Sequence, residues 1–315
     1  LSHITGAVKY AHSEVGTLGR LESESPEVHG KTAEQWEIEF LPRPIEESAD
    51  ALVLARWVIR NVAYRHGCIA TFAPKIEEGV AGNGMHIHIA AVSNGRNAMC
   101  DGQGLSNTAR RLIGGLCAHA PSLTAFGNTV SAAYLRLVPN QEAPTSVCWS
   151  DSDRGAMVRV PLAWNGVSDL AASINDRKSS AAEQRDSAQT VELRTPDGSA
   201  MVHLLLAGIA MSAEWGLVNE ESIETAELAY LGRKQDKSNR LASLPRSCVE
   251  SAHLLRSHRQ RYERQDVFSP RIVDYVCQLL ESENDDGINA RLAALPADDR
   301  LRETRKIMHK DLHRQ

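Results

Sequence analysis

The sequence lacks the features that mark several classes of protein. No stretch approaches 18 consecutive apolar residues, so no membrane-spanning helix is predicted. Lysine and arginine are scattered and the net charge is -5, which argues against nucleic-acid binding through a basic face. There is no Walker loop, GxGxxG turn, internal repeat or low-complexity tract. No glycine-rich phosphate-binding loop is therefore predicted.

The six cysteines occur singly, without a CxxC pair or a zinc-type spacing, and several lie in apolar runs. Such cysteines are typical of reduced, cytoplasmic thiols that pack as small hydrophobic side chains. Aromatic residues make up only 5% and charged residues 24%, an ordinary globular composition for 315 residues. The chain begins with Leu1 rather than Met and shows no signal peptide, so we expect a segment to precede it.

The most informative stretch is 82–90, Gly-Asn-Gly-Met-His-Ile-His-Ile-Ala. Its alternation predicts a strand with His86 and His88 on one face and the Met and Ile side chains on the other. Two such histidines lie about 7 Å apart, which suits one metal ligand beside a group that touches a neighbouring ligand. The preceding glycines allow close backbone approach. The alternative is a half-buried strand whose histidines are surface residues or hydrogen-bond within the core.

A second strand is predicted at 35–40. Its alternation places Gln35, Glu37 and Glu39 on one face and Trp36, Ile38 and Phe40 in the interior. A row of carboxylates on one strand face is costly unless it is solvated, paired or holding cations. Both a cation site and an ordinary solvent-facing strand surface are compatible with this pattern.

Helices and short strands are predicted along the rest of the first half. We expect a helix at 1–20, a helix capped by Ser48 and closed by Gly67, a short strand at 68–72, a helix capped by Ser106, and a shorter helix restarted by Pro121. The prolines of 134–144 predict an irregular loop, which carries Arg136 and Glu142.

The second half predicts two strands followed by helices. The strands are expected at 156–160 and 190–194, with a polar insert at 176–189 between them. A buried helix is expected at 199–218. The remainder, 220–315, is expected to be helical, with charged linkers near 234–239 and 281–287.

The polar residues of these strands and loops form a mixed acidic and basic set. Its members are Glu37, His86, His88, Glu142, Glu192, Arg136, Arg154, Arg159 and Arg194. Carboxylates with one imidazole suit Mg²⁺ or Mn²⁺. Arginines bind phosphates and carboxylates and stabilise the charge that develops in phosphoryl transfer. The set predicts a site for an anionic substrate, a nucleotide and a divalent metal.

Five motifs resemble the glutamine synthetase superfamily in their order and spacing. They are Ala70-Thr71-Phe72-Ala73-Pro74-Lys75, Gly82-Asn83-Gly84-Met85-His86-Ile87-His88, Arg136-Leu137-Val138-Pro139-Asn140-Gln141-Glu142-Ala143-Pro144, the segment 154–161, and Glu192-Leu193-Arg194-Thr195-Pro196-Asp197. The resemblance covers about residues 27 to 210, and the C-terminal helices match only in kind.

The resemblance implies an α+β fold with a curved, mainly antiparallel sheet that carries the site on its concave face and helices on the other face. Residues 1–315 would form one catalytic domain that lacks the family's N-terminal β-grasp domain, with 220–315 as its mostly helical C-terminal part. It also implies a homo-oligomeric ring whose active sites lie between adjacent subunits.

The chemistry implied by the resemblance is that of an ATP-dependent ligase. The γ-carboxylate of glutamate would take the γ-phosphoryl group of ATP, and an amine would then displace phosphate. The resemblance implies that Mg²⁺ or Mn²⁺ is bound by Glu37, His86, Glu192 and the nearby carboxylate Glu27. It implies that the substrate is bound by Arg136, Arg194 and the Gly82 backbone, and that ATP contacts His88 and Arg159. It implies catalytic roles for Glu142 and Arg154.

Several positions depart from the family pattern. Gly30 stands near the place of a metal-binding Glu, Thr190 replaces an ATP-contacting Arg, and Asn140-Gln141 replaces a common Gly-aromatic pair. The Glu-x-Glu strand that completes both metal sites is predicted to be missing. These departures favour a γ-glutamyl–amine ligase. Glutamine synthetase proper, using ammonia, and a non-catalytic homologue are the alternatives.

Overall fold

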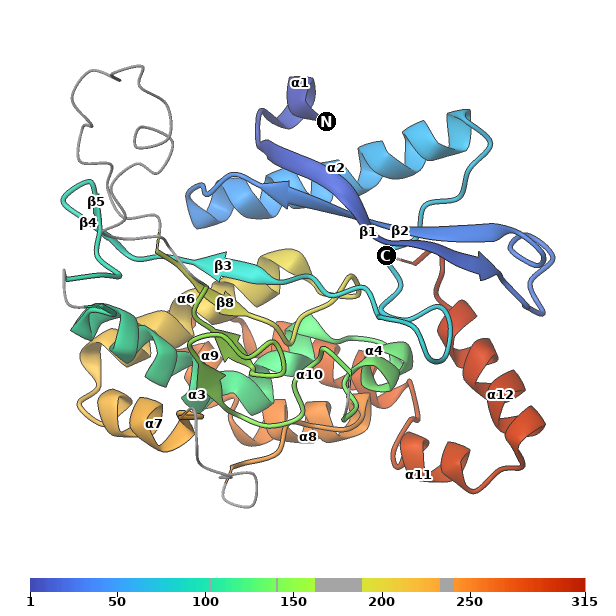
Figure 1. Cartoon of the computed structure of the whole chain (residues 1–315). Coiled ribbons are helices and arrows are strands. Elements are labelled where there is room, and N and C mark those ends of the chain that lie inside the picture. Colours follow the sequence, from blue (N-terminus) through green and yellow to red (C-terminus); the bar gives the residue numbers. More distant parts are fainter. Residues whose placement is uncertain (102–103, 140, 162–188, 233–240, 315) are drawn as a thin grey trace.

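The computed structural model describes residues 1–101, 104–139, 141–161, 189–232 and 241–314. Residues 176–188 of the predicted insert and the predicted linker at 234–239 lie outside these residues, as does Asn140. Helices and strands are mixed along the chain, and the fold is α+β as predicted (Figure 1).

The strands form a four-stranded sheet and two smaller ribbons. The four-stranded sheet has the order β3 (Ile87–Ile89), β8 (Val191–Leu193), β7 (Val158–Arg159), β6 (Trp149–Ser150), antiparallel except between β6 and β7. A long antiparallel hairpin joins β1 (Val8–Arg20) to β2 (Thr32–Phe40), and a short one joins β4 (Val92–Ser93) to β5 (Arg96–Asn97). Mainly antiparallel pairing is therefore confirmed.

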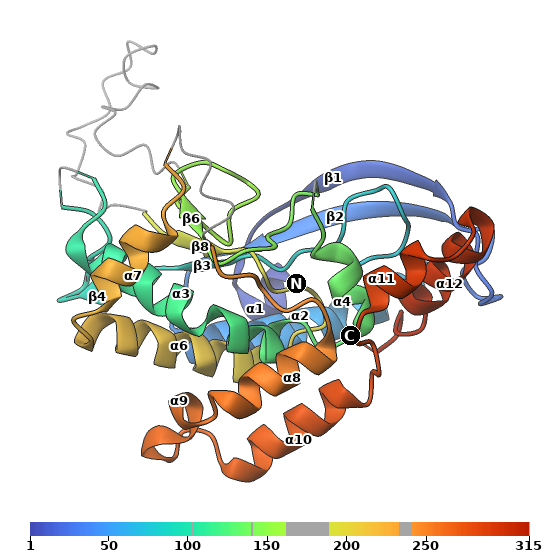
Figure 2. The same cartoon turned by 90° about the horizontal axis from the view of Figure 1, so that it is seen from below.

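The helices gather on one side of these strands (Figure 2). They are α1 (Ser2–Thr5), α2 (Ile45–Arg65), α3 (Asn107–Gly127), α4 (Ser131–Arg136), α6 (Val202–Val218), α7 (Ser222–Ala229), α8 (Cys248–Ser257), α9 (Gln260–Glu263), the 3-10 turn η2 (Arg264–Asp266), α10 (Pro270–Glu281), α11 (Ile288–Ala293) and α12 (Ala297–His309). The main hydrophobic core joins α3, α6 and α8 to the inner face of β7 and β8.

Helix α3 occupies the centre of the helical layer. The Ser106 side chain accepts a hydrogen bond from the Ala109 amide, which confirms the predicted cap. Close helix packing needs the small residues of α3, because a Cβ on Gly115 would meet the Ser212 carbonyl oxygen of α6 at 2.0 Å. The predicted break at Pro121 is wrong, since α3 continues to Gly127 and buries both of its halves in the core.

Four further predictions of secondary structure are wrong. Arg136, predicted to lie in an irregular loop, is the last residue of helix α4. Residues 8–20 form strand β1, because pairing with β2 along its whole length supplies backbone hydrogen bonds that outweigh local helical propensity. Helix α2 begins at Ile45 after Pro44, three residues before Ser48. The segment 68–72 is irregular, although Gly67 ends α2 in the left-handed conformation as expected.

The predicted faces of β2 are only partly correct. Trp36 is 62% exposed rather than buried, because the β1–β2 hairpin forms a ribbon of its own outside the four-stranded sheet. By contrast, the Met85, Ile87 and Ile89 side chains pack against the main core, as their alternation predicted.

Within the described part of the chain, no single helix is long and apolar enough to cross a membrane. Helices α6 and α7 reach the length and apolar composition of a membrane span only when they are taken together, as a pair bent by 109°. All six cysteines are free thiols, and four of them are buried.

Candidate functional site

Glu192, on β8, is the centre of the candidate site. The sheet register pairs it with His88 on β3 and with Arg159 on β7. The Arg159 guanidinium donates to its Oε2 at 2.9 Å and Arg194 donates to its Oε1 at 2.5 Å, while His86 Nδ1 lies 3.1 Å from Oε1. Adjacent strands thus bring together four residues that the sequence predicted, and we call them the Glu192 cluster: His86, Arg159, Glu192 and Arg194.

The charges of the Glu192 cluster fix its protonation. Burial alone would raise the pKa of Glu192, but the hydrogen bond from His86 and the charge of Arg194 outweigh it and hold the pKa near 2. Burial is also the largest influence on His86 and lowers its pKa. At neutral pH the cluster therefore holds a carboxylate ion beside a neutral imidazole whose other ring nitrogen can bind a ligand.

Arg136 lies behind this cluster and is almost fully buried at the end of α4. Its two terminal nitrogens donate to the Thr195 carbonyl oxygen at 2.8 Å and to the Arg194 carbonyl oxygen at 3.0 Å. Gly82 packs directly on its side chain, since a Cβ there would meet Arg136 Cγ at 2.9 Å and the Pro74 carbonyl oxygen at 2.7 Å. The predicted substrate residues Arg136 and Gly82 are therefore neighbours, and only glycine fits at position 82.

Glu142 and Arg154 lie at the rim of the site. Their side chains are mostly exposed and form an ion pair at 3.6 Å. Both loops are tied to the cluster through their backbones, because Arg194 donates to the Arg154 carbonyl oxygen at 3.0 Å and, more weakly, to the Glu142 carbonyl oxygen at 3.4 Å. The predicted catalytic pair is thus placed next to the predicted substrate arginine.

A second polar group lies on the β1–β2 hairpin. His12 and Glu14 on β1 and Glu37 on β2 offer ligand atoms that all lie within 4.8 Å of one another, an arrangement able to hold a metal ion. His12 Nε2 is 3.4 Å from Glu37 and its Nδ1 is 3.7 Å from Glu14. Burial and the nearby Glu14 raise the pKa of Glu37. We call these three residues the hairpin cluster.

The sequence prediction missed His12 and Glu14. It treated residues 1–20 as a helix, and it expected the Glu-x-Glu strand that completes both metal sites of the family to be missing from the chain. The available signal was the His12-Ser13-Glu14 alternation, which places two ligand types on one face of a strand. Strand β1 supplies such a strand with a histidine and one glutamate.

The hairpin is joined to the sheet next to the Glu192 cluster. The Gln35 amide donates to the Gly82 carbonyl oxygen at 3.1 Å and to the Asn83 side chain at 2.8 Å. His88 Nδ1 lies 3.0 Å from the Thr190 hydroxyl, and the Thr190 departure therefore provides a partner for the predicted ATP residue. The two Gln35 contacts hold the hairpin against the segment that leads into β3.

Glu27 lies apart from both clusters. It pairs with His313 at 2.8 Å, near the C-terminal end of the described chain. Gly30 sits in the same connection with a φ of +72°, so a glutamate at that position would be strained in this turn. The structure thus places two of the predicted metal ligands, His86 and Glu192, next to each other. A third, Glu37, lies with His12 and Glu14, which were not predicted. Glu27 belongs to neither cluster.

Comparisons with known proteins identify the family of this chain. Residues 15–290 match the family model described as glutamine synthetase, catalytic domain. The chain belongs to the glutamine synthetase family. It is 31% identical over 271 residues to a glutamine synthetase of Streptomyces coelicolor, covering 85% of this chain and 50% of the relative, and 37% identical over 196 residues to one of Pyrococcus horikoshii, covering 61% and 39%. The chain thus spans about half the length, or less, of these relatives.

A glutamine synthetase of Plasmodium falciparum, solved by cryo-EM, has a similar structure. The match has a TM-score of 0.64 with 21% sequence identity and covers 93% of this chain and 57% of that one. At this identity the likeness concerns the fold. It supports the α+β architecture of the glutamine synthetase catalytic domain, and the family match confirms the predicted superfamily.

Proposed function

We propose that the protein is an ATP-dependent ligase that forms a γ-glutamyl phosphate from glutamate and transfers the γ-glutamyl group to an amine. The observation that carries this proposal is the Glu192 cluster, in which one buried carboxylate ion is held by two arginines and a neutral histidine. Such a group suits substrates that carry phosphate and carboxylate groups. Membership of a ligase family supports it.

The donor sets of the two clusters fit divalent cations. One imidazole and two carboxylates in the hairpin cluster match the ligand types of Mg²⁺ and Mn²⁺, and His86 with Glu192 offers a second pair. A bound cation would neutralise charge on the phosphate oxygens of ATP. Binding at Glu192 would require Arg159 or Arg194 to yield one of its hydrogen bonds to that carboxylate.

The chain's own residues divide the remaining work. Arg136 and Arg194 would orient the carboxylates of glutamate, while Arg154 and Arg159 would contact the transferred phosphoryl group, with His88 at the nucleotide. An oxygen of the γ-carboxylate attacks the γ-phosphorus and ADP leaves. The amine nitrogen then attacks the acyl carbon, Glu142 takes up its proton, and phosphate departs.

The exposure of the hairpin cluster supports an assembly of several copies. His12, Glu14 and Glu37 are all exposed, although they would have to work in a water-excluded site. We propose that a neighbouring subunit covers them in a homo-oligomeric ring. The six free thiols support a reducing, cytoplasmic compartment.

A non-catalytic homologue is the second candidate. Gly30 removes a carboxylate that the family pattern provides, and its φ of +72° shows that the turn is built for glycine. Glu192 is also already paired with two arginines. The Glu192 cluster counts against this candidate, because a buried charged group without a ligand is destabilising.

The deciding experiment is γ-phosphate release from ATP by the full-length protein with glutamate, across a panel of amines that includes ammonia. Turnover with one organic amine and little with ammonia is the expected result. Glu142→Gln should lower the rate by about 10²–10⁴-fold if Glu142 takes the proton from the amine. Glu220→Gln, on the exposed connection between α6 and α7, is the matched control and should leave the rate unchanged.

Other outcomes would redirect the proposal. Turnover with ammonia alone would identify glutamine synthetase proper despite Gly30. No turnover with any amine, together with no rise in melting temperature on adding Mg²⁺-ATP, would leave the non-catalytic homologue.

A further inference from the structure

The segment 80–85, which carries Gly82, is held by hydrogen bonds to the loop that precedes it. The Asn83 amide donates to the Pro74 carbonyl oxygen at 2.8 Å. The Asn83 side chain donates to the Ala73 carbonyl oxygen at 2.7 Å. These bonds fix one side of the segment, and they involve no residue of the β1–β2 hairpin.

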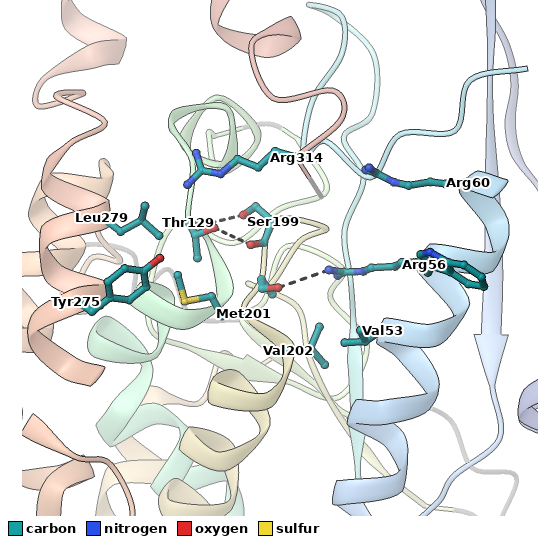
Figure 3. Close-up of a pocket in the computed structure, with 12 residues that line it drawn as sticks. Val53, Arg56, Arg60, Thr129, Ser199, Met201, Val202, Tyr275, Leu279 and Arg314 are labelled. Carbon is teal, nitrogen blue, oxygen red and sulfur yellow. Dashed lines mark hydrogen bonds between the residues drawn. The ribbon is translucent and has the colours of Figure 1, made fainter. Parts of the chain in front are cut away.

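Helix α2 supports the same segment. The Arg56 guanidinium donates to the Met85 sulfur at 3.0 Å and to the Ala200 carbonyl oxygen at 3.5 Å. Figure 3 shows the second of these bonds, which crosses from α2 to the loop that leads into α6. The segment is therefore supported on this side as well without a hydrogen bond from β1 or β2.

Gln35 of β2 joins the hairpin to this segment. Its side-chain nitrogen donates to the Gly82 carbonyl oxygen at 3.1 Å and to the Asn83 side-chain oxygen at 2.8 Å. A glutamine amide carries two N–H groups, so one side chain can serve both acceptors. The position of β2 is thereby linked to the orientation of the Gly82 peptide, next to the predicted substrate residue Arg136.

Gln35 is also the neighbour of the hairpin cluster. It lies on the same face of β2 as Glu37, two residues and about 7 Å along the strand. It pairs with Gly16 of β1, and the register of the two strands shifts immediately before this pair. Glu14 lies in this bulge, and bulges re-aim the side chains that they carry. The bulge thus separates the pair that holds Gln35 from the pair that joins Glu37 to His12.

A cation in the hairpin cluster would tie the two strands together at this bulge. The ligand atoms of Glu14 and Glu37 lie within 4.8 Å of each other, so two ionised carboxylates would repel one another. A divalent cation bound by both carboxylates and by His12 removes this repulsion and links β1 to β2. The same ion therefore fixes the part of β2 from which Gln35 reaches Gly82.

We propose that Gln35 is a positioning residue that couples cation binding at the hairpin cluster to glutamate binding at the Gly82 backbone. This inference rests on the proposed function, since it takes glutamate as the substrate and a divalent cation as the ligand of the hairpin cluster. Gln35 touches no reacting atom and acts by holding the Gly82 peptide in place. Because coupling between two binding sites is reciprocal, glutamate tightens cation binding by the same factor.

The test is calorimetric titration of the full-length protein with L-glutamate, with and without saturating Mn²⁺. In the wild type, Mn²⁺ should lower the Kd for glutamate by about tenfold, a typical coupling between two sites. Gln35→Met keeps the length of the side chain but removes its donor, and it should reduce this factor to about twofold or less. Gln278→Met, at an exposed glutamine on α10, is the matched control and should keep the full factor.

The ratio of the two Kd values separates a positioning role from a structural one. General loosening of the hairpin would weaken glutamate binding equally with and without Mn²⁺ and would leave the ratio unchanged. Gln35→Asn is a second variant, which keeps the amide but is one methylene group shorter and cannot reach both acceptors. It should lose the coupling as well, and melting curves will show that each variant is folded.

The remaining outcomes would overturn the inference. A full factor in both Gln35 variants, or an equal Kd with and without Mn²⁺ in the wild type, would exclude the coupling and leave the proposed function intact. No binding of glutamate by the wild type under either condition would overturn the inference together with the proposed function.

Discussion

At the scale of single residues, Glu192 shows how the site determines its own charge. A buried carboxylate alone would tend to be protonated, but His86, Arg159 and Arg194 surround this one within hydrogen-bonding distance. The same residue therefore contributes to stability and defines where positive charge is held. Removing its charge would leave the nearly buried Arg194 without a counter-ion.

We predict a pH-dependent stability effect for Glu192→Gln. The pKa of the wild-type Glu192 carboxyl falls from 4.5 to about 2 on folding. The contribution of this carboxylate to the free energy of unfolding is therefore fully present above pH 4.5 and is lost as the pH falls toward 2. The variant should be less stable by about 3 kcal/mol at pH 7, and this difference should shrink steadily below pH 4.5. Urea unfolding of both proteins at several pH values measures it.

The exposed pair of Glu303 and Lys306 provides the control. Glu303→Gln should lower the free energy of unfolding by less than about 0.5 kcal/mol at pH 7. An equal and pH-independent loss in the two variants would show that Glu192 is not held as an ion by its arginines.

At the scale of elements, the β1–β2 hairpin decides whether the protein has a second cation site. Pairing aligns His12 opposite Glu37, and the alternation of β1 adds Glu14 on the same face. Neither strand forms this group alone. The Gln35 contacts to Gly82 and Asn83 then fix the hairpin against the segment that leads through His86 into β3.

Mn²⁺ should raise the melting temperature of the protein, because a ligand that binds only the folded state stabilises it by about 2.7 kcal/mol at 100 times its Kd. His12→Ala should remove at least half of this rise, since the hairpin cluster loses its imidazole. His203→Ala, an exposed histidine paired with Asp50, is the control and should retain the full rise. A full rise in His12→Ala would exclude the hairpin as a cation site.

At the scale of the whole molecule, the C-terminal helices support the site from outside. Met308 of α12 and Ile288 of α11 pack with Leu135, which precedes Arg136 on α4. Arg305 of α12 also pairs with Glu77 at 3.0 Å, in the connection that leads to β3. The residues that hold the substrate arginine in place thus come from more than 150 positions further along the sequence.

We predict that Met308→Ala lowers the free energy of unfolding by about 2–4 kcal/mol, because it leaves a cavity in this small cluster. Leu295→Ala, at a side chain that is 38% exposed, should cost less than about 1 kcal/mol. Urea unfolding of the two variants provides the comparison. Equal, small effects would mean that α12 does not support α4.

Features that depend on local chemistry could be predicted from the amino-acid sequence. The cap of α3 at Ser106, the buried face of the His86 strand and the buried helix near 199–218 all follow from periodicity and from short-range hydrogen bonds. The family motifs predicted one site from four residues, His86, Arg159, Glu192 and Arg194. The register of the strands brings these residues into contact.

Features that depend on partners far apart in the sequence could not be predicted in this way. Residues 8–20 became a strand because β2 pairs with them, which created the hairpin cluster and exposed Trp36. The Glu27 side chain pairs with His313, and Arg60 donates to the His313 carbonyl oxygen, over sequence separations that no local pattern records. Local propensities amount to fractions of a kcal/mol per residue, so a full ladder of backbone hydrogen bonds or a buried ion pair overrides them.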